Sequence, residues 1–390
     1  MARVCMVAYT NYQFDSRVRR EAEALVQRGD TVDFICLEDE NAENPEYHNG
    51  VRLIKISSKR YRGSDAKMYL TSYLYFFMAV TFKLAGLQLK NSYQVIQVHT
   101  MPDFMVFVAV LPKLMGAKVL LDVHDLMPEL YQSKFGFSET HFLIRFITWI
   151  ERISIGFANR AIAVHKPHLE ALCSHGNPAG KFTLLLNLPD MKIFGNGAGD
   201  LHENKTSFDL IYHGTVSRRH GLEIAIQAVR ALRGKIKELK LSIIGEGDDI
   251  SRLTNMVKEL DILDHVHIKN SVPLDELVGQ IKSADIGIIP LLYDDFTKYM
   301  LPVKLLEYVA LEIPVICTRT ETIETYFDNS MIQYFSSGSA NELADDILFL
   351  YQNPDRRREL ITNASKFNQA YNWEKQKQSY YQLIDALMEK

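Results

Sequence analysis

The strongest constraint on the fold of this chain is the alternation of short, continuously apolar runs with segments of helical period. The runs "RVCMVAY" (3–9) and "TVDFICL" (31–37) flank the helical-period segment "SRVRREAEALVQRG", and "YQVIQVH" (93–99) and "KVLLDVHD" (118–125) continue the series. Strands that are apolar on both faces and separated by helices are typical of a parallel sheet covered on both sides. The first part of the chain is therefore predicted to form a doubly wound α/β domain.

The same alternation begins again in the second half of the chain. Further apolar runs occupy residues 207–214, 240–247, 265–270, 284–290 and 314–318. A chain of 390 residues is also too long for one ordinary core. We predict two Rossmann-like domains, at 1–190 and 205–370, joined within the Gly-, Asn- and Asp-rich segment 186–207 and followed by a helix at 371–390. Because ligands of such sheets bind at the carboxyl ends of the strands, a cleft between the two domains is the expected site.

Composition narrows the class and the compartment. The apolar fraction of 47% and the charged fraction of 24% are those of a soluble globular protein, and the net charge of −4 argues against a nucleic-acid binder. The four cysteines are far apart and form no CxxC pair, so neither a disulfide framework nor a zinc site is indicated. The N-terminus enters an apolar strand without the pattern of a signal peptide, and we expect a cytoplasmic protein.

The segment "MYLTSYLYFFMAVTFKLAGLQLK" (68–90) is about as long as a membrane span. Thr71, Ser72 and Lys83 interrupt its apolar run, which disfavours a true span. A cluster of lysines and arginines precedes it, and a basic cluster followed by an aromatic, amphipathic helix is typical of a membrane-surface patch. Residues 55–90 are therefore interpreted either as a peripheral contact with an anionic membrane or as a buried helix beside a solvated loop.

Neither domain carries the fingerprint of a dinucleotide site. The first strand–helix turn, "AYTNYQFDSR", contains no glycine, and "IIGEGDD" offers only Gly245-x-Gly247. Asp248 and Asp249 then stand at the start of the next helix, where they repel a phosphate. A nicotinamide-dependent enzyme is not expected.

The turn "YHGTVSRRHGLEIAIQAV" (212–229) is predicted to bind an anion. Gly214 permits a tight turn after the strand, and Gly221 opens an amphipathic helix. Thr215, Ser217, Arg218, Arg219 and His220 lie between the two glycines. Backbone N–H groups at a helix start favour an anion, and guanidinium groups match a phosphate or diphosphate bidentately. The alternative is a solvated basic loop.

The stretch "KYMLPVKLLEYVALEIPVIC" (298–317) places two charges in an apolar segment. Pro302 suits the first turn of a helix, and Lys304 and Glu307 then share one face. If the helix start points into a cleft, Lys304 reaches a phosphate and Glu307 accepts hydrogen bonds from sugar hydroxyls. The alternative is an exposed i,i+3 ion pair.

The apolar run that ends in "LLDVHDLMPELY" (120–131) places Asp122, His124, Asp125 and Glu129 at the carboxyl end of a strand. We expect His124 to hydrogen-bond a substrate hydroxyl or phosphate, with Asp125 orienting it. A metal site is not expected, because no second cluster stands out as a set of ligands.

Together these segments resemble glycosyltransferase family 4, retaining enzymes of the GT-B fold. The resemblance covers nearly the whole chain and is carried by "DSRVRREAEAL", "HDLMPE", "HGT…HGLEIAIQA", "SADIGIIP" and "PVKLLEYVALEIPV". It implies two Rossmann-like domains that face a central cleft. It also implies that the C-terminal helix, "FNQAYNWEKQKQSYYQLIDAL", crosses back onto the first domain.

What the resemblance implies for function is transfer of a sugar from a UDP- or GDP-sugar, with retention at the anomeric carbon and without a metal or other cofactor. His124, by the same resemblance, lies near the transferred sugar, Glu307 binds the nucleotide ribose, and the Gly214 turn holds the diphosphate. Together with His124, Arg219 and Lys304 are the predicted catalytic residues, since they can stabilise the charge of the departing diphosphate.

Three positions depart from the family pattern. Thr215 and His220 stand where the family often has an arginine and a lysine, and Tyr299 stands where the first glutamate of a paired motif is expected. We interpret these as substitutions, in which Arg219 and Lys304 take over the phosphate contacts.

The acceptor is expected to meet the first domain. Asn11, Asp15 and Arg17 in the first strand–helix turn, together with Asp125, are the predicted acceptor-side residues. The basic and aromatic segment 55–90 favours a membrane-bound acceptor, such as a polyprenyl-diphosphate-linked glycan in bacterial surface polysaccharide synthesis. Two alternatives are a GT-B nucleotide-sugar epimerase and a non-catalytic partner subunit.

Overall fold

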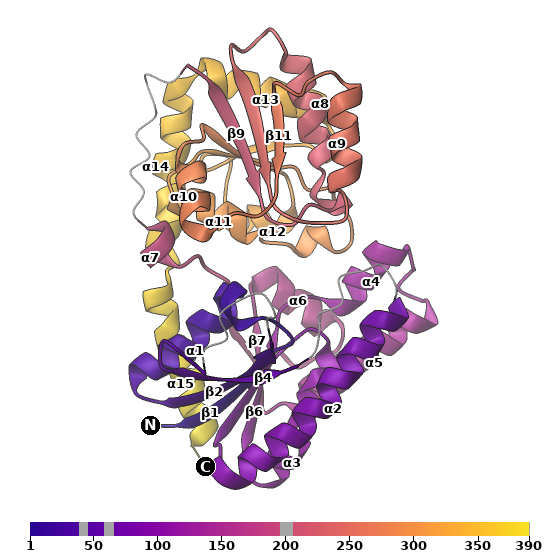
Figure 1. Cartoon of the computed structure of the whole chain (residues 1–390), viewed down its shortest axis with the longest axis vertical. Coiled ribbons are helices and arrows are strands. Elements are labelled where there is room, and N and C mark those ends of the chain that lie inside the picture. The colour runs from indigo at the N-terminus through magenta and orange to yellow at the C-terminus, as the bar shows by residue number, and fades with distance from the viewer. Residues whose placement is uncertain (39–45, 58–65, 196–205, 390) are drawn as a thin grey trace. The chain divides into compact units, whose positions relative to one another are not determined.

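The computed structural model describes residues 1–38, 46–57, 66–195 and 206–389, and these residues form two compact units (Figure 1). Unit 1 comprises Met1–Asn187 and Glu374–Lys390, and unit 2 comprises Leu188–Trp373. The predicted domain boundaries at 190 and 371 lie within a few residues of these divisions. Residues 196–205 of the predicted joining segment, 186–207, lie outside the described residues.

Unit 1 is built on an eight-stranded sheet with the strand order β3-β4-β2-β1-β5-β6-β7-β8. Its strands are β1 (Arg3–Val7), β2 (Thr31–Leu37), β3 (Tyr47–His48), β4 (Val51–Ile56), β5 (Val95–His99), β6 (Lys118–Val123), β7 (Arg160–Ala163) and β8 (Phe182–Leu184). All pairs are parallel except β3 with β4. The chain runs outward from β1 on one side and returns to continue with β5 on the other. Such a reversal is where ligands of doubly wound sheets bind.

Helices cover both faces of this sheet. They are α1 (Ser16–Arg28), α2 (Ala66–Asn91), α3 (Val110–Leu114), α4 (Met127–Phe135), α5 (Phe142–Phe157), α6 (Lys166–Ser174) and α15 (Trp373–Met388), with 3-10 turns η1 (Tyr12–Phe14), η2 (Asp103–Ala109) and η3 (Ala179–Lys181). The start of α1 is fixed by Asp15, whose carboxylate accepts a hydrogen bond from the Val18 N–H. Gly29, at φ 98°, ends the same helix in the left-handed conformation.

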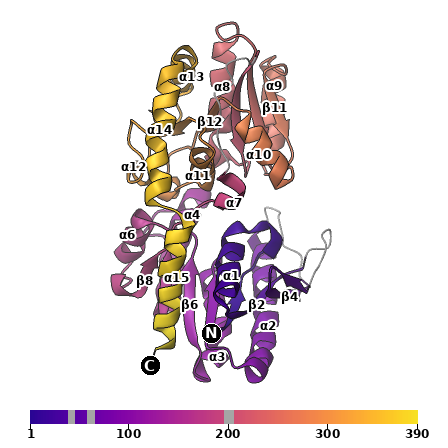
Figure 2. The ribbon, with the colours of Figure 1, turned by 90° about the vertical axis from the view of Figure 1, so that its left-hand side faces the viewer.

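The C-terminal helix α15 belongs to unit 1, although it follows the whole of unit 2 in the chain (Figure 2). Tyr380 is fully buried there, and its hydroxyl donates to Gln97 Oε1 of β5 at 2.6 Å. The Tyr381 hydroxyl donates to the Ala24 carbonyl of α1 at 2.8 Å, and Asp385 pairs with Arg28. The C-terminal helix thus completes the packing of the first domain.

Unit 2 is built on a six-stranded, fully parallel sheet with the order β11-β10-β9-β12-β13-β14. Its strands are β9 (Phe208–His213), β10 (Leu239–Ile244), β11 (Val266–Lys269), β12 (Ile286–Ile289), β13 (Val315–Thr318) and β14 (Gln333–Phe335). The order reverses between β9 and β12, so the loop after β9 lies at the place where a ligand is expected.

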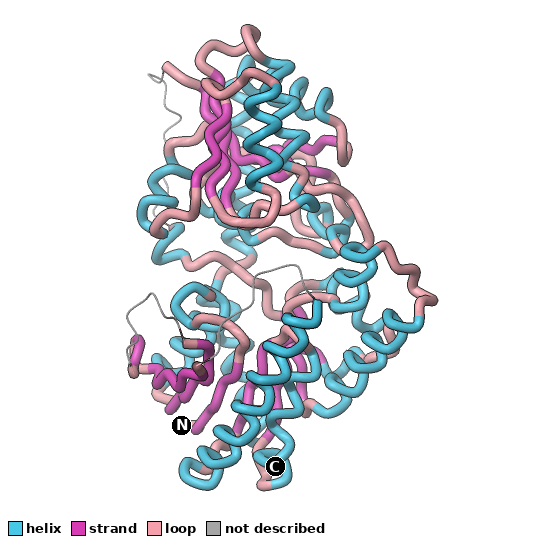
Figure 3. Tube along the Cα trace, turned by 45° about the vertical axis from the view of Figure 1, so that its right-hand side comes forward, coloured by secondary structure: helices cyan, strands magenta, loops and turns pink. Residues whose placement is uncertain are grey.

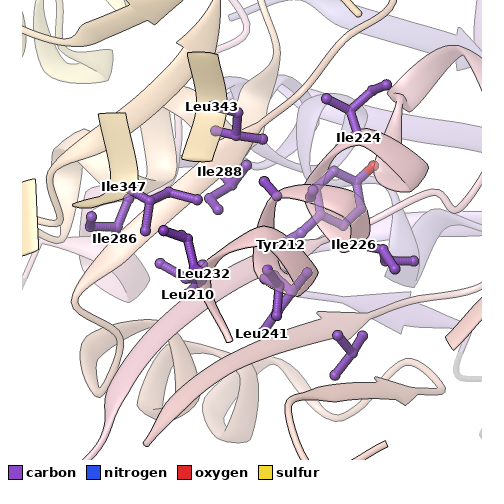
Figure 4. Close-up of a cluster of buried hydrophobic side chains, with 14 of the residues drawn as sticks. Leu210, Tyr212, Ile224, Ile226, Leu232, Leu241, Ile286, Ile288, Leu343 and Ile347 are labelled. Atoms are coloured by element: carbon purple, nitrogen blue, oxygen red, sulfur yellow. The ribbon is translucent and has the colours of Figure 1, made fainter. Parts of the chain in front are cut away.

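The helices of unit 2 enclose its sheet and bury one continuous apolar core. They are α7 (Met191–Phe194), α8 (Leu222–Leu232), α9 (Ile250–Glu259), α10 (Leu274–Lys282), α11 (Val303–Ala310), α12 (Glu321–Glu324), α13 (Ala340–Gln352) and α14 (Pro354–Ala370), with 3-10 turns η4 (Arg218–His220) and η5 (Thr297–Tyr299). Figure 4 shows Leu210, Leu241 and Ile288 of the strands meeting Ile226 of α8 and Ile347 of α13. These side chains lie on one face of the sheet, and Ile211 of β9 is buried on the other face, so β9 is covered on both sides in the middle of the sheet.

Candidate functional site

The loop after β9 has a backbone that only glycines can form. Gly214 has φ 107° and Gly221 has φ 60°, and a Cβ on Gly221 would lie 1.9 Å from the Pro290 carbonyl oxygen. A Cβ on Gly245 would lie 1.8 Å from the Gly214 carbonyl oxygen, so the loop after β10 packs directly on this turn. The Gly214 N–H donates to the Ile244 carbonyl at 2.9 Å. These contacts fix the Gly214 turn in one conformation.

Lys304 of α11 lies against this turn. Its Nζ would be 3.3 Å from a Cβ added to Gly214, and it donates to the Tyr212 hydroxyl at 2.6 Å. It also lies 3.9 Å from the centre of the Tyr212 ring, and that hydroxyl in turn donates to the Thr215 carbonyl. Burial, with a contribution from Arg219, lowers the pKa of Lys304 to about 7 although Glu307 opposes the shift. The ammonium is therefore only partly compensated and favours an anion beside Gly214.

Glu307, one turn further along α11, contacts a different partner. Its Oε2 lies 2.9 Å from Nε2 of His213, the last residue of β9, and the His213 ring stacks on Tyr308 with centroids 5.1 Å apart. Burial raises the pKa of Glu307 to about 7, while burial and Lys304 lower the pKa of His213 to about 3. His213 is therefore neutral at physiological pH. Glu307 and Lys304 do not act as a surface ion pair, because each packs on the carboxyl end of β9.

Between Gly214 and Gly221, three buried polar atoms have no hydrogen-bond partner. They are Ser217 Oγ, Arg219 Nε and His220 Nδ1. Burial, Lys304 and Arg219 together lower the pKa of His220 to about 2, so its ring is neutral. Buried polar atoms without partners are costly in a folded protein and are expected where a ligand binds. Donor groups that lack acceptors, beside two cations, fit an anionic ligand.

The other residues predicted for this site lie nearby along the chain but differ in exposure. Thr215 and Arg218 are exposed, and Arg218 begins the 3-10 turn η4. The Arg219 guanidinium lies over the Phe296 ring, 5.4 Å from its centre. Tyr299 ends η5, and the Lys298 ammonium lies 5.3 Å from the centre of its ring. Pro302 is the N-cap of α11, as its position before Lys304 suggests.

In unit 1, the carboxyl ends of β5 and β6 hold a buried polar cluster around Asp122. Arg17 of α1 donates to both oxygens of the Asp122 carboxylate. His99 Nδ1 and His124 Nε2 each lie 2.9 Å from Asp122 Oδ2. His99 pairs with Asp122 in the register of β5 and β6, and its ring meets that of His124 edge to face. Among these four residues His124 is the one that is partly exposed, so it is the member that can meet a substrate.

Mutual charges set the ionisation of this cluster. Burial alone would raise the pKa of the Asp122 carboxyl, but Arg17 and the two histidines hold it well below its usual range. Burial opposes protonation of His99, yet the hydrogen bond and charge of Asp122 raise its pKa. Asp122 is therefore a permanent anion whose hydrogen bonds orient His124.

The carboxylate that orients His124 was predicted to be Asp125, and this is corrected by the structure. His124 directly follows β6, and its Nε2 lies 2.9 Å from Oδ2 of Asp122 on that strand, whereas Asp125 lies one residue further along the chain. Arg17 was also expected to line the acceptor side, but the structure places it inside the unit. It is 4% exposed and is held by Asp122, so it supports the cluster from within.

The remaining acceptor-side predictions are placed at the start of α1. Asn11 is partly exposed and precedes η1, and Asp15 caps α1 through its hydrogen bond with Val18. Asp15 therefore has a structural role that accounts for its side chain.

Tyr212, His213 and His99 are site residues that the sequence analysis did not single out. His99 and His213 are the last residues of β5 and β9, where a polar residue breaks the apolar run, and Tyr212 immediately precedes His213. That break was a usable signal, because strand ends at the centre of a doubly wound sheet carry ligand contacts.

Among the described residues, one group of side chains could hold a metal ion: His99, Asp122 and His124. Their ligand atoms lie within 4.8 Å of one another. The Nδ1 and Nε2 atoms lie at hydrogen-bond distance from one carboxylate oxygen, and the other oxygen accepts from Arg17. A cation would have to displace that guanidinium or sit beside it. The expectation of metal independence stays a prediction.

Two family models match the chain, and together they span most of its length. Residues 15–187 match the model described as a glycosyl transferase 4-like domain, and residues 198–367 match the one described as glycosyl transferases group 1. The first covers the Asp122 cluster, and the second covers the Gly214 turn and α11.

Individual proteins agree with the family models. The amylovoran biosynthesis glycosyltransferase AmsK of Erwinia amylovora is 28% identical over 35% of this chain. That match spans 34% of AmsK, so only about a third of the relative's length is aligned. Sucrose-phosphate synthase from Thermosynechococcus elongatus superposes with a TM-score of 0.78 at 19% identity, covering 99% of both chains. HepE of Anabaena, in complex with UDP-glucose, gives 0.75 at 12% identity over 99% of this chain and 100% of its own. These two likenesses show the shared fold of two Rossmann-like domains.

Proposed function

Since the chain belongs to the glycosyltransferases that combine a 4-like domain with a group 1 domain, we propose that it transfers a sugar from a nucleotide-sugar to a glycan or lipid-linked glycan. The observation that carries this proposal is the set of unpartnered donors around Gly214, with the Lys304 ammonium beside them. UDP-glucose is bound by the structural neighbour HepE, which supports a UDP-sugar as donor. The AmsK relative supports a role in polysaccharide biosynthesis.

In this proposal the diphosphate of the donor lies against the Gly214 turn. Arg219 Nε and His220 Nδ1 are buried atoms that lack partners, and Ser217 adds a hydroxyl. His220 has one ring nitrogen that donates when the ring is neutral, so the ring can serve a phosphate oxygen without carrying a charge. Glu307 stands one turn behind Lys304 and can accept hydrogen bonds from two ribose hydroxyls.

The chemical task at this site is to stabilise charge on the leaving group. When the bond between the anomeric carbon and the diphosphate breaks, its electrons remain on the phosphate oxygen. Lys304 and Arg219 can neutralise that developing charge in a partly desolvated place, where electrostatic interactions are stronger than in water. Bound diphosphate also raises the pKa of Lys304 back toward its ordinary value, so the ammonium is fully protonated when it is needed.

His124 and the Asp122 cluster are proposed to serve the transferred sugar. His124 is the partly exposed member of the cluster, and Asp122 fixes its ring through Nε2. Its Nδ1 can then meet a sugar hydroxyl. Retention at the anomeric carbon, independence from metals and a cytoplasmic location all belong to this proposal as consequences of the family resemblance.

Donor binding tests the proposal most directly. Calorimetry with UDP, GDP and ADP should give binding by one of them, and Lys304→Ala should weaken it about 5- to 150-fold, or about 1–3 kcal/mol, if the ammonium contacts phosphate. Lys298→Ala is the matched control, since Lys298 lies six residues before Lys304, in the 3-10 turn η5, and pairs with Asp295. Loss of a surface ion pair should change the affinity by about twofold or less.

The opposite results have clear meanings. If no nucleoside diphosphate binds, the chain is a non-catalytic partner and the proposal fails. If a nucleotide-sugar is converted to its epimer without any acceptor, the epimerase alternative is correct. Chromatographic analysis of products from UDP-sugars, with and without a glycan acceptor, distinguishes these outcomes, and the proton NMR coupling of the new linkage reports retention.

A further inference from the structure

Unit 1 exposes an unusual number of large apolar side chains on three helices that lie on one side of it. These helices are α2, α3 and α5, and Figure 1 shows them together, away from α1 and α15. Both α2 and α5 pack against the same 3-10 segment, η2, and α3 continues directly from it. Figure 3 brings this side of the unit forward. We call it the α2–α3–α5 face.

On α2, the exposed and buried side chains occupy opposite sides of the helix. Phe76, Val80 and Leu84 are fully buried at intervals of four residues, and Phe76 packs edge to face on Tyr9. Phe82 and Leu89, seven residues apart, are 71% and 73% exposed. A helix that is apolar on both sides but buried on one has a second apolar surface without a partner.

The other two helices extend this surface. Leu114, at the end of α3, is 79% exposed. On α5, Phe142, Phe146 and Trp149 are exposed at intervals of four and three residues, and the rings of Phe146 and Trp149 stack 5.8 Å apart. Exposed aromatic side chains at helical spacing are characteristic of surfaces that enter the interface of a bilayer.

The charges on this face have one sign. Lys83, Lys90, Arg145 and Arg152 are exposed on α2 and α5. Glu151 is the single acidic residue in the sequences of α2, α3 and α5. Its side chain is 1% exposed and contacts His175. The described part of the face therefore combines apolar side chains with cations and exposes no carboxylate of its own helices. The basic residues of the sequence between 58 and 65, which belong to the cluster preceding α2, lie outside the described residues.

We propose that the α2–α3–α5 face docks this enzyme onto a membrane rich in anionic lipid. Exposed lysines and arginines are complementary to anionic headgroups, and the aromatic and aliphatic side chains between them can enter the acyl boundary. The membrane contact expected for segment 55–90 is thereby extended to two further helices, α3 and α5. The biological reason for docking, which is access to a lipid-linked acceptor, rests on the proposed function.

Docking in the plane of the membrane agrees with the packing of α2 better than spanning does. Within the described residues, Leu70–Asn91 is the helix segment long and apolar enough to cross a membrane, with a mean hydropathy of 1.3. Its side toward Phe76 and Leu84 is occupied by the core of unit 1, so the helix cannot leave the domain without opening that core. The free side alone is available to lipid.

Vesicle binding of the full chain tests the proposal without nucleotide or acceptor. We expect cosedimentation with vesicles of phosphatidylcholine and phosphatidylglycerol, and much less with phosphatidylcholine alone or in high salt. The fluorescence emission of Trp149 should shift to shorter wavelength on binding. The Trp373→Phe variant retains Trp149 as its remaining tryptophan, so its emission reports this residue alone. Phe82→Glu and Phe146→Glu should each lower the partition constant about tenfold or more.

A matched control comes from unit 2. Phe349 of α13 is 45% exposed but lies outside the face, so Phe349→Glu should leave vesicle binding unchanged. Should an apolar variant fail to fold, Lys83→Glu with Arg145→Glu changes only exposed charges and should still reduce binding to the anionic vesicles.

Two results would overturn the proposal. One is wild-type protein that ignores anionic vesicles while it still binds a nucleoside diphosphate, which leaves the proposed function intact. The other is self-association of the wild type that Phe82→Glu abolishes without any vesicle binding, since the face is then an interface between copies. Absence of nucleotide binding with normal vesicle binding would contradict the proposed function alone.

Discussion

Asp122 in unit 1 and the Gly214 turn in unit 2 both lie at the carboxyl ends of strands, but both oxygens of Asp122 have hydrogen-bond partners, whereas the Gly214 turn retains buried polar atoms without partners. In unit 1, Asp122 receives hydrogen bonds from Arg17, His99 and His124, and its charge is compensated. In unit 2, Arg219 and His220 have buried nitrogens without acceptors. A satisfied cluster holds a side chain in place, whereas an unsatisfied one awaits a ligand. The comparison assigns positioning to the first and binding to the second.

Breaking the satisfied cluster should have the largest effect. Asp122→Asn removes the closer of the two carboxylates that pair with the buried Arg17 and leaves only Glu21 at 3.4 Å, and we expect the free energy of unfolding to fall by about 3–5 kcal/mol. Transferase activity should also be lost, because His124 loses the carboxylate that orients it. Urea denaturation measures the stability. Asp125→Asn, two positions beyond that strand's end, is the control and should change stability by about 0.5 kcal/mol or less; equal effects of both would refute the assignment.

The affinity of the Gly214 turn for a nucleoside diphosphate should depend on pH. Lys304 has a pKa of about 7 in the free protein, and a bound diphosphate raises it, so the complex binds more protons than the free protein. Affinity for UDP should therefore fall as pH rises from 7 to 9, by up to about tenfold per pH unit. Glu307, whose pKa is also about 7, becomes an anion over the same range and opposes part of this fall, because a carboxylate accepts hydrogen bonds from the ribose hydroxyls better than the protonated acid does.

Substitutions separate these two contributions. Lys304→Arg keeps a cation at every pH and should flatten the dependence, while Lys304→Arg with Glu307→Gln should remove it. Calorimetry at several pH values provides the measurement. An undiminished slope in the double variant would mean that neither residue senses the ligand.

The link between α15 and the unit 1 cluster predicts a smaller effect. Tyr380 donates to Gln97, which donates to Glu21 at 2.7 Å and lies 3.4 Å from His99. Tyr380→Phe should lower kcat several-fold, by about 1 kcal/mol, with little change in the KM for donor. Tyr381→Phe removes a hydroxyl from the next residue, whose partner is a carbonyl of α1, and should leave kcat unchanged. A purely structural role would lower stability in both variants and kcat in neither.

Chelation is expected to have no effect. His99, Asp122 and His124 are close enough to ligate a cation, but Arg17 already compensates the carboxylate. Activity after dialysis against EDTA should equal the starting activity, and added Zn²⁺ should inhibit if it displaces the hydrogen bonds to Asp122. Activity that requires restored metal would reverse the roles of the two clusters.

Much of the architecture can be predicted from the sequence because it depends on the pattern of residues close together in the chain. Continuous apolar runs predicted both parallel sheets, and Gly214 and Gly221 predicted a tight turn that the backbone requires. Lys304 and Glu307 were assigned to one helix face near this turn from their spacing and from Pro302. The structure brings Lys304 to Gly214, while their role with a ligand stays a prediction.

Other features depend on contacts between distant residues, which periodicity does not encode. Tyr212 and Lys304 are 92 residues apart, and Tyr380 reaches Gln97 over 283 residues. Asp122 was within reach of the sequence analysis, since strand alternation places it on the same side as His124. Arg17 was not, because an arginine early in a first helix is usually solvated, and its burial depends on the carboxylate of another strand.

The return of α15 to unit 1 also bears on the order in which the chain can mature during synthesis. Unit 2 is one uninterrupted segment, so it has all its residues once Trp373 has left the ribosome. The first unit, although it is translated earlier, lacks Tyr380 and Leu387 of its core until the final helix emerges. We therefore expect unit 2 to be able to complete its core before unit 1, the reverse of the usual order, and a chain that stops before Trp373 should leave apolar core residues of unit 1 exposed to chaperones.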